Sequence, residues 1–206
     1  MKRMKIKSIK KIQNTSKRYD IEVRDNHNFF ANKMLVHNCS STFYSKDGKF
    51  GFCGRNWEFK PETKNTYSEI VKKYHLDKKL EELKIDIAIQ GEIVGPGIQG
   101  NKYKLSEHKL FLFHAYDIER QEYYSHDNFM ALCDALGVDS VPVIGDMIFD
   151  SISVEDLLKM AEGESKLYKT QREGIVIKSR YEERDVETGR LSFKVISNKF
   201  LMKHNE

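Results

Sequence analysis

The sequence is poor in cysteine and proline and has no long apolar segment. Its three cysteines, among 206 residues, stand at positions 39, 53 and 133. This number and spacing give neither a disulfide framework nor a Cys-x-x-Cys metal site, which is typical of a reducing, cytosolic compartment. No apolar run approaches the ~18 residues that a bilayer-spanning helix needs, and the apolar segment of a secretory signal is missing after the N-terminus. The composition therefore excludes a membrane protein and a disulfide-stapled secreted domain.

The positive charge is concentrated at the N-terminus. Residues 1–38 contain ten Lys or Arg against three Asp or Glu, a net charge of +7, whereas residues 39–206 have a net charge of −3. A solvated tail or a nucleic-acid-binding arm is one interpretation of such a segment. Isoleucines at every third position from 6 to 12, followed by strand-like sequence, favour a small folded piece that seeks an acidic partner.

The pattern of apolar residues predicts more strands than helices. Strands are expected where β-branched and aromatic residues gather, and helices where apolar residues recur at helical spacing. The strands are expected at 19–23, 28–36, 41–44, 49–54, 85–94, 110–118, 174–178 and 191–196, and the helices at 68–83, 125–136 and 153–161. A hairpin around Asp47-Gly48 is typical of antiparallel pairing. The predicted fold class is α+β with an antiparallel-rich sheet.

The tripeptide His37-Asn38-Cys39 contains three chemically complementary groups. An asparagine amide can attack its own carbonyl and break the following peptide bond, and an imidazole can protonate the leaving amine. A cysteine thiolate can accept an acyl group before that cleavage. Taken alone, the tripeptide is also compatible with an exposed loop.

The sequence around this tripeptide makes residues 1–38 resemble the C-terminal part of an intein. The matching segments are residues 19–23, residues 27–32 and residues 35–38 before Cys39. The chain begins with its own Met, and no intein nucleophile or Thr-x-x-His block precedes Asp20. The resemblance therefore implies the C-terminal fragment of a split intein, a small all-β piece of HINT type.

This resemblance implies a role for each matching residue. Asn38 would cyclise with help from His37, and Cys39 would receive the upstream segment. His27 and Asp20 would orient and protonate the branched intermediate. The partner would be an acidic N-terminal intein fragment, attracted by the charge of +7 on residues 1–38.

Residues 39–206 carry several polar groups next to predicted strands. A Gly-rich loop, residues 95–100, nearly spells a phosphate loop, but Asn101 precedes Lys102 and no Ser or Thr follows, so a P-loop is rejected. The remaining lysines, carboxylates and aromatics suit a nucleotide bound on a sheet. Each one also has a structural interpretation, as an exposed strand charge, a turn residue or a core aromatic.

Together these groups resemble the nucleotidyltransferase domain of ATP-dependent RNA ligases. The matching motifs, in order, are Arg55-Asn56, Gly91-Glu92 with the loop 95–101, Phe113–Ile118, Glu173–Lys178 and Ser192–Phe200. The predicted domains are therefore 1–38, the intein fragment, and 39–206, the adenylation domain of a cytoplasmic enzyme for which a phage is one candidate source.

The ligase resemblance implies ATP and Mg²⁺ (or Mn²⁺) as cofactors and RNA as a partner. Arg55 would contact phosphates and the acceptor end, and Glu92 would bind the ribose. Tyr116 would stack on adenine, and Glu173 would hold metal-bound water. Lys178 and Lys194 would bind the α-phosphate.

Two departures from the ligase pattern stand out. The last motif commonly has a second lysine where this chain has Ile196, and whether Lys199 replaces it stays open. The nucleophilic Lys-x-Asp-Gly motif is absent, and residues 39–43 look like its continuation. Trans-splicing to a partner chain that carries this lysine would rebuild the ligase, and the isolated chain is expected to be inactive in self-adenylation. A DNA ligase, an mRNA-capping enzyme and a non-catalytic RNA-binding module remain the alternatives.

Overall fold

The computed structural model describes residues 9–11, 19–21, 29–31, 34–36, 40–55, 57–148, 150, 152–186 and 189–204. The chain divides into two compact units, Met1–Cys39 and Ser40–Glu206. In the described part of the first unit, β1 (Ile9–Lys11) pairs with β2 (Tyr19–Ile21), and β3 (Phe29–Ala31) pairs with β4 (Met34–Val36). The strand predicted over residues 28–36 is therefore two short antiparallel strands. The sequence also predicts a turn at Asp25-Asn26, between the strands expected at 19–23 and 28–36, and these two residues lie outside the described residues.

A five-stranded antiparallel sheet is the centre of the second unit, with the strand order β6-β5-β7-β8-β9. Its strands are β5 (Ser40–Lys46), β6 (Lys49–Cys53), β7 (Ile87–Val94), β8 (Lys109–Asp117) and β9 (Glu122–Tyr123). The predicted hairpin is present, and Asp47 and Gly48 both have positive φ at its turn. The antiparallel α+β prediction is confirmed for this unit.

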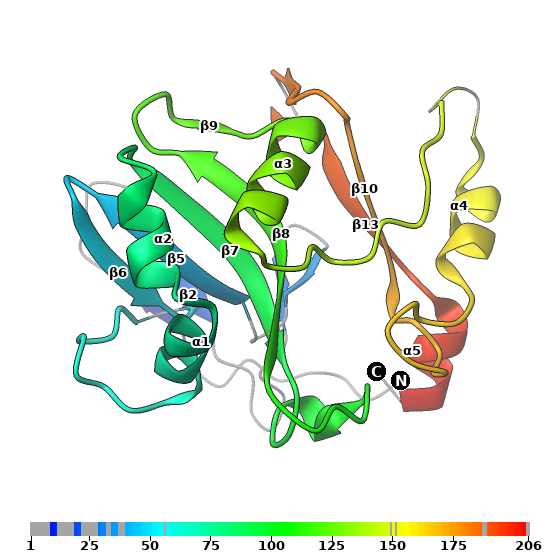
Figure 1. Cartoon of the computed structure of the whole chain (residues 1–206). Helices are drawn as coiled ribbons and strands as arrows, with labels where there is room; N and C mark the ends of the chain where they lie inside the picture. Colours follow the sequence, from blue (N-terminus) through cyan, green and yellow to red (C-terminus); the bar gives the residue numbers. More distant parts are fainter. Residues whose placement is uncertain are drawn as a thin grey trace. The chain divides into compact units, whose positions relative to one another are not determined.

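Three helices cover one face of this sheet, α1 (Thr66–Tyr74), α2 (Leu76–Glu82) and α3 (His126–Leu136) (Figure 1). Fully buried side chains from both layers form the core: Phe43, Ile70, Leu76, Leu80, Ile87, Ile89, Leu110, Leu112 and Leu136. Burying each such side chain stabilises the fold by about 1.5–3 kcal/mol. Because side chains alternate along a strand, this core fixes which residues point to the other face.

The other face of the sheet is polar. Four cross-strand pairs alternate with the core positions and form one row on this face: Thr42↔Gln90, Gln90↔His114, Ala88↔Tyr116 and Ser40↔Glu92. We call the side formed by Thr42, Tyr44, Gln90, Glu92, His114 and Tyr116 the polar face. The register shifts between Gln90 and Gly91, where Gly91 pairs with Leu112, so Phe113 is an extra residue that forms a β-bulge in β8.

A second, smaller layer contains the last two predicted strands, β10 (Gly174–Lys178) and β13 (Ser192–Ile196), which pair with each other. Helix α4 (Val154–Ala161) packs on both strands. Figure 1 shows α5 (Asn198–His204) at one end of this strand pair and the β11 (Arg184–Asp185) and β12 (Gly189–Arg190) hairpin at the other. The sequence pattern did not indicate β9, β11, β12, α5 or the 3₁₀ turn Gln99–Asn101.

The helix expected over residues 68–83 is interrupted. His75 has φ 54° and ψ 41°, a left-handed conformation that ends α1 and begins α2. Apolar spacing continues across the break, so periodicity alone did not reveal it. The other two helices match the predicted ranges 125–136 and 153–161 to within one residue: Ser125 and Ser153 are their N-caps, Gly137 ends α3, and α4 ends at Ala161.

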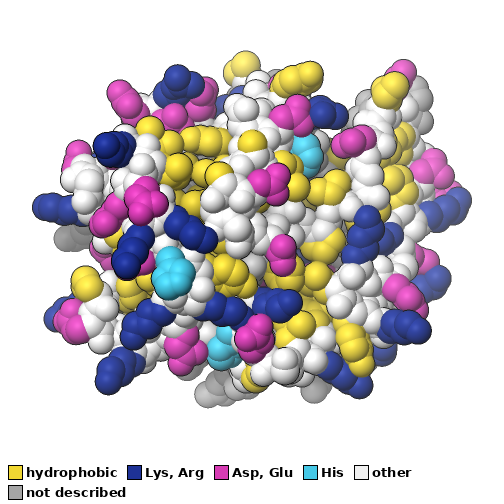
Figure 2. Space-filling model, in the orientation of Figure 1, with side chains coloured by type: hydrophobic (Ala, Val, Ile, Leu, Met, Phe, Trp, Pro, Cys, Tyr) yellow, Lys and Arg dark blue, Asp and Glu magenta, His cyan; other side chains and the backbone are white. Residues whose placement is uncertain are grey.

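The helices of the described segments are all too short or too polar to cross a membrane. Figure 2 shows the helix-covered side of the second unit, where Lys and Arg side chains gather over α1 and α2. Among them are Lys72, Lys73 and Lys78, which are exposed. These lysines lie on the side of the sheet opposite to the polar face.

Candidate functional site

The strand pair β10–β13 presents two lysines on the same side. Lys194 pairs with Val176 and Lys178 pairs with Ser192, so both lysines belong to the same alternating set of positions. The pair starts at Gly174, where a Cβ atom would lie 2.1 Å from the Val195 carbonyl oxygen. Only glycine allows the two backbones to approach this closely. The sequence Glu173-Gly174 therefore fixes where the strand pair begins.

Glu173 and Lys194 form an ion pair in which both side chains are partly buried. Glu173 also anchors the chain, because its carbonyl accepts a hydrogen bond from Ser197 N–H at 2.8 Å. A partly buried ion pair holds both groups in a defined place, unlike a solvated pair on an open surface. Two of the predicted site residues are therefore brought into contact.

A cavity of about 120 Å³ brings Glu92 and Glu173 to one site. Its remaining lining residues are Lys102, Tyr103, Thr170, Gln171 and Phe200. Burial raises the pKa of the Tyr103 phenol, and the charges of Glu92 and Glu173 raise it further. Tyr103 is thus an uncharged hydroxyl near two carboxylates. Nothing in its sequence context distinguished it, since the ligase motif that includes the preceding loop was matched only over residues 95–101.

In the described part of the chain, no three His, Cys, Asp or Glu side chains gather closely enough to bind a metal ion. The two carboxylates of the cavity, Glu92 and Glu173, are a small set of the kind that suits Mg²⁺, which keeps several waters and shares the phosphates of a substrate. Glu173, which lines the cavity and forms an ion pair with Lys194, is compatible with the water-bridged role that was predicted for it.

Lys178 reaches from β10 to the bulge of the five-stranded sheet. Its Nζ donates a hydrogen bond to the Phe113 carbonyl oxygen at 2.7 Å. Removal of the ammonium from bulk water lowers the pKa of Lys178 to about 8; the charge of Arg190 contributes to this shift, and the charge of Glu182 opposes it. A lysine with such a pKa is a common feature of functional sites.

Tyr116 lies on the polar face next to a cluster of rings. Its ring meets Tyr123 of β9 edge to face, with centroids 5.0 Å apart. The His114 ring is also 5.0 Å from Tyr123. Burial lowers the pKa of His114 to about 3, and the charges of Lys178 and Arg190 act in the same direction. His114 is therefore neutral at physiological pH.

Arg55 follows β6 and is not among the residues that line the small cavity. Its loop is closed by a hydrogen bond from Gly54 N–H to the Trp57 carbonyl at 3.0 Å. The neighbouring Asn56 lies outside the described residues. The structure therefore brings together Glu92, Glu173 and Lys194, with Lys178 on the same strand pair, whereas Arg55 follows β6 and does not line the small cavity.

The two residues considered for the last lysine of the ligase pattern differ in their positions. Ile196 pairs with Gly174 and belongs to the same alternating set as Lys194. Lys199 lies in α5, and its ammonium forms an ion pair with Glu162 at 2.6 Å. Lys199 is thus directed to the end of α4 in this structure.

The predicted splicing residues fall mostly outside the described part of the chain. His27, His37, Asn38 and Cys39 are in this group. Asp20 lies in β2, where its backbone pairs with Lys10. The other two cysteines would be buried if they were ordinary core residues; Cys133 is buried, but Cys53 is only half-buried, and burial raises the pKa of both thiols.

A larger cavity, of about 390 Å³, lies beside α3 and is separate from these residues. It is lined by Phe111, Met130, Cys133, Asp134, Gly137, Val138, Asp139 and Ser140. No predicted site residue belongs to it. The smaller cavity is therefore the one that matters for the chemistry predicted from the sequence.

Comparisons with known proteins find similar sequences and structures in one family. The sequence profile of the RNA ligase family matches residues 33–196. The solved structure of Naegleria gruberi RNA ligase with PPi is 34% identical, covers 82% of this chain and 50% of that ligase, and has a TM-score of 0.73. An arginine-to-alanine mutant of the same ligase, solved with ATP and Mn, is also 34% identical. It covers 82% of this chain and 50% of that ligase, with a TM-score of 0.74. The chain spans about half the length of these ligases. A search of curated proteins gives no match.

Proposed function

This chain belongs to the RNA ligase family, and from that premise we propose that it is one half of an ATP-dependent RNA ligase. Residues 39–206, joined to an upstream segment, would seal an RNA 3′-hydroxyl to a 5′-phosphate. The observation that carries the proposal is the Glu173–Lys194 ion pair beside a cavity that Glu92 and Glu173 share. Such a combination of cations and carboxylates suits a nucleotide with its phosphates.

The proposed reaction has three steps. A lysine attacks the α-phosphate of ATP and releases pyrophosphate. The RNA 5′-phosphate then takes the AMP and frees the lysine, and the 3′-hydroxyl finally displaces AMP to form the phosphodiester. Lys178 and Lys194 would bind the transferred phosphate, Glu92 the ribose and Tyr116 the adenine. Arg55 would contact phosphates and the acceptor end. The enzyme acts mainly by positioning these groups and by stabilising charge.

Glu173 is the residue that would hold hydrated Mg²⁺ or Mn²⁺. When bound, the metal ion neutralises charge on the phosphates. The ion pair with Lys194 keeps the Glu173 carboxylate in a fixed place before the metal ion arrives. The separate N. gruberi ligase, whose mutants were solved with ATP and Mn, supports the choice of nucleotide and metal.

The nucleophilic lysine would come from a partner chain through trans-splicing. Asn38, His37 and Cys39 would carry out the cleavage and the transfer, with His27 and Asp20 orienting the intermediate. Two observations support this proposal: the sequence contains no Lys-x-Asp-Gly, and the chain divides into compact units after Cys39. The partner would supply an acidic intein fragment fused to the upstream ligase segment.

Mass spectrometry of this chain mixed with its partner tests the splicing proposal. We expect residues 1–38 to be released with a C-terminal succinimide and a new peptide bond to form at Cys39. Asn38→Ala should abolish this release, because alanine has no amide to cyclise, whereas Asn14→Ala should leave it unchanged. If Asn38→Ala gave the same products as the wild type, residues 1–38 would not be an intein fragment.

Sealing of nicked RNA by the joined protein tests the ligase proposal. We expect Glu173→Gln to slow sealing by roughly ten- to a hundredfold, because the metal-bound water loses its carboxylate partner. Glu183→Gln is the matched control, since Glu183 is exposed.

Nicked DNA and GTP serve as the competing substrates. Preference for nicked DNA would favour a DNA ligase, and lysine labelling from GTP would favour a capping-type enzyme. RNA binding without any sealing would favour the non-catalytic module.

A further inference from the structure

Arg190 of β12 contacts two aromatic residues on the polar face, although the proposed function assigns it no role. Its Nη1 lies 2.6 Å from His114 Nε2. Its guanidinium carbon lies 3.9 Å from the centroid of the Tyr123 ring. His114 and Arg190 are far apart in the sequence, and the fold brings them together across β8 and β12.

Glu182 holds the Arg190 side chain in place. Arg190 Nε lies 2.7 Å from Glu182 Oε1 and 2.9 Å from Oε2. The two side chains are only 18% and 19% exposed. A planar guanidinium that is bonded along one edge and stacked on a ring has little freedom to turn. Arg190 is therefore a fixed element of the site, in contrast to the exposed Arg184 opposite it in the β11–β12 ladder.

The contact with Arg190 determines where the His114 proton lies. A guanidinium has five N–H donors and no acceptor, so His114 Nε2 must accept this hydrogen bond. The imidazole proton is then on Nδ1. The groups that face His114 from the neighbouring strands are Lys178, Arg190 and Tyr123, and the two cations oppose a second proton on the ring. His114 is thus held as one neutral tautomer.

The same guanidinium also supports Tyr116. Tyr123 contacts both the Arg190 guanidinium and the Tyr116 ring, and it meets the Tyr116 ring edge to face at 5.0 Å. Tyr116 and Tyr123 also pair across β8 and β9. The Tyr123 ring is thus held by a cation–π contact with Arg190 and by an edge-to-face contact with Tyr116. Each contact stabilises one relative arrangement of the two groups that make it.

We propose that Arg190 is the positioning residue of the nucleobase site, acting through His114 and Tyr123 on the ring of Tyr116. The ligand is the purine base of the nucleotide that the ligase consumes. The proposal rests on the proposed function, in which Tyr116 stacks on that base. In this role Arg190 would act only through the two rings that it contacts, Tyr123 and His114.

The first test measures the tautomer of His114 in the full chain by ¹⁵N NMR of the imidazole nitrogens. His114→Gln identifies the signals. In the wild type we expect the neutral Nδ1–H form, without titration from pH 5 to pH 8. In Arg190→Lys the fixed tautomer should be lost. A wild-type His114 that carries its proton on Nε2, or that becomes charged in this range, would overturn the proposal.

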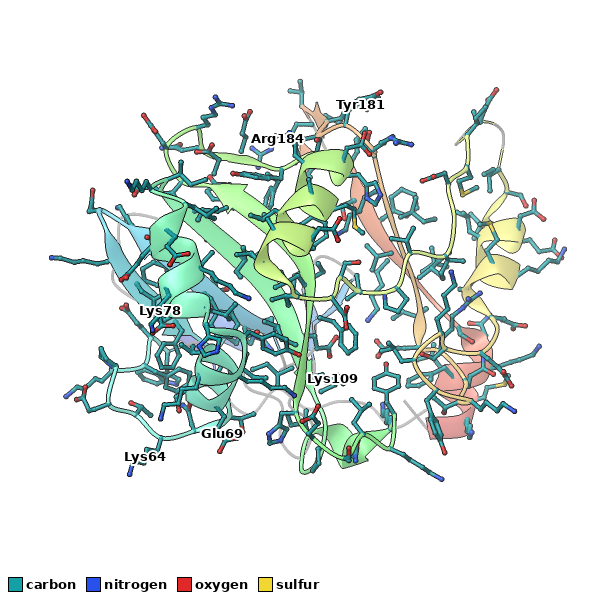
Figure 3. The ribbon with its side chains drawn as sticks, in the orientation of Figure 1. Lys64, Glu69, Lys78, Lys109, Tyr181 and Arg184 are labelled. Carbon is teal, nitrogen blue, oxygen red and sulfur yellow. The ribbon has the colours of Figure 1, made fainter. Side chains whose placement is uncertain are left out.

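The second test measures ATP kinetics of the joined protein. Arg190→Lys keeps the charge but loses the planar contact, so we expect KM for ATP to rise about tenfold, with kcat changed less than twofold. Arg184→Lys is the matched control, because Arg184 is an exposed residue of β11 (labelled in Figure 3). This variant should keep wild-type values. Thermal unfolding of each variant checks that it is folded.

The outcomes separate this proposal from the proposed function. A joined wild type that forms no lysine–AMP and seals no RNA overturns both. An active wild type whose Arg190→Lys variant keeps a KM for ATP within twofold overturns the positioning role of Arg190 alone. If Arg190→Lys does not fold, the tautomer of His114 in the wild type decides whether the proposed contact exists.

Discussion

At the scale of single residues, His114 couples the polar face to the stability of the fold. Its pKa is lowered from 6.5 to about 3, mainly because the ring is buried and also because Lys178 and Arg190 lie near it. The unfolded chain therefore binds a proton that the folded chain does not bind between these two pH values. More protons on the unfolded state mean that stability rises with pH in this window. Acidification from pH 6.5 towards pH 3 should thus destabilise the protein.

We expect His114→Gln to reduce this acid sensitivity. The variant takes up one proton fewer on unfolding, and one proton corresponds to a slope of about 1.4 kcal/mol per pH unit. On acidification, the variant's free energy of unfolding should therefore fall less steeply than that of the wild type, by up to this slope. The glutamine oxygen can still accept the hydrogen bond from Arg190. Urea unfolding of both proteins at several values between pH 4 and pH 7 gives the two slopes. Equal slopes would mean that His114 does not titrate with a lowered pKa.

At the scale of secondary-structure elements, the sequence predicts the strands and most helix ends but not the break at His75. Alternation and helical spacing of apolar residues are local signals, and the ranges 125–136 and 153–161 drawn from them match α3 and α4 to within one residue. The break between α1 and α2 leaves the apolar spacing intact, because Leu76 and Leu80 still reach the core. Only the left-handed backbone of His75 marks it, and a single histidine, although enriched in that conformation, is too weak a signal to locate a break.

This break gives a prediction about stability. A non-glycine residue in the left-handed region costs about 1–2 kcal/mol, so His75→Gly should stabilise the protein by about 1 kcal/mol. The converse change is Gly137→Ala, at a helix end with φ 60°, and it should cost about 1 kcal/mol for the same reason. Chemical denaturation measures both changes in the free energy of unfolding, and the m-values of the variants should equal that of the wild type. A loss of stability in His75→Gly would show that its side chain contributes more than its backbone costs.

At the scale of the whole molecule, the ordered motifs of the sequence identified several residues that the fold brings together. They did not identify all the residues that contact these in the folded chain. Glu92, Glu173 and Lys194 were each found from motifs, and the fold places the two carboxylates at one cavity. Tyr103 and Arg190 were missed because their roles depend on encounters between distant segments. Arg190 meets His114 only through the pairing of β11 with β12 and the position of this hairpin beside β8. No local pattern contains that information.

The uneven charge of the whole chain gives the last prediction. The net charge of +7 on residues 1–38 should steer this chain to an acidic intein partner, and steering of this kind raises association rates by roughly ten- to a thousandfold. Salt screens it, so the second-order rate of splicing should fall roughly tenfold or more between low and high ionic strength. Stopped-flow fluorescence or timed mass spectra measure this rate. The first-order cleavage at Asn38, measured after the fragments have associated, is the internal control and should change little. An association rate that is independent of salt would mean that charge does not guide the partner to this segment.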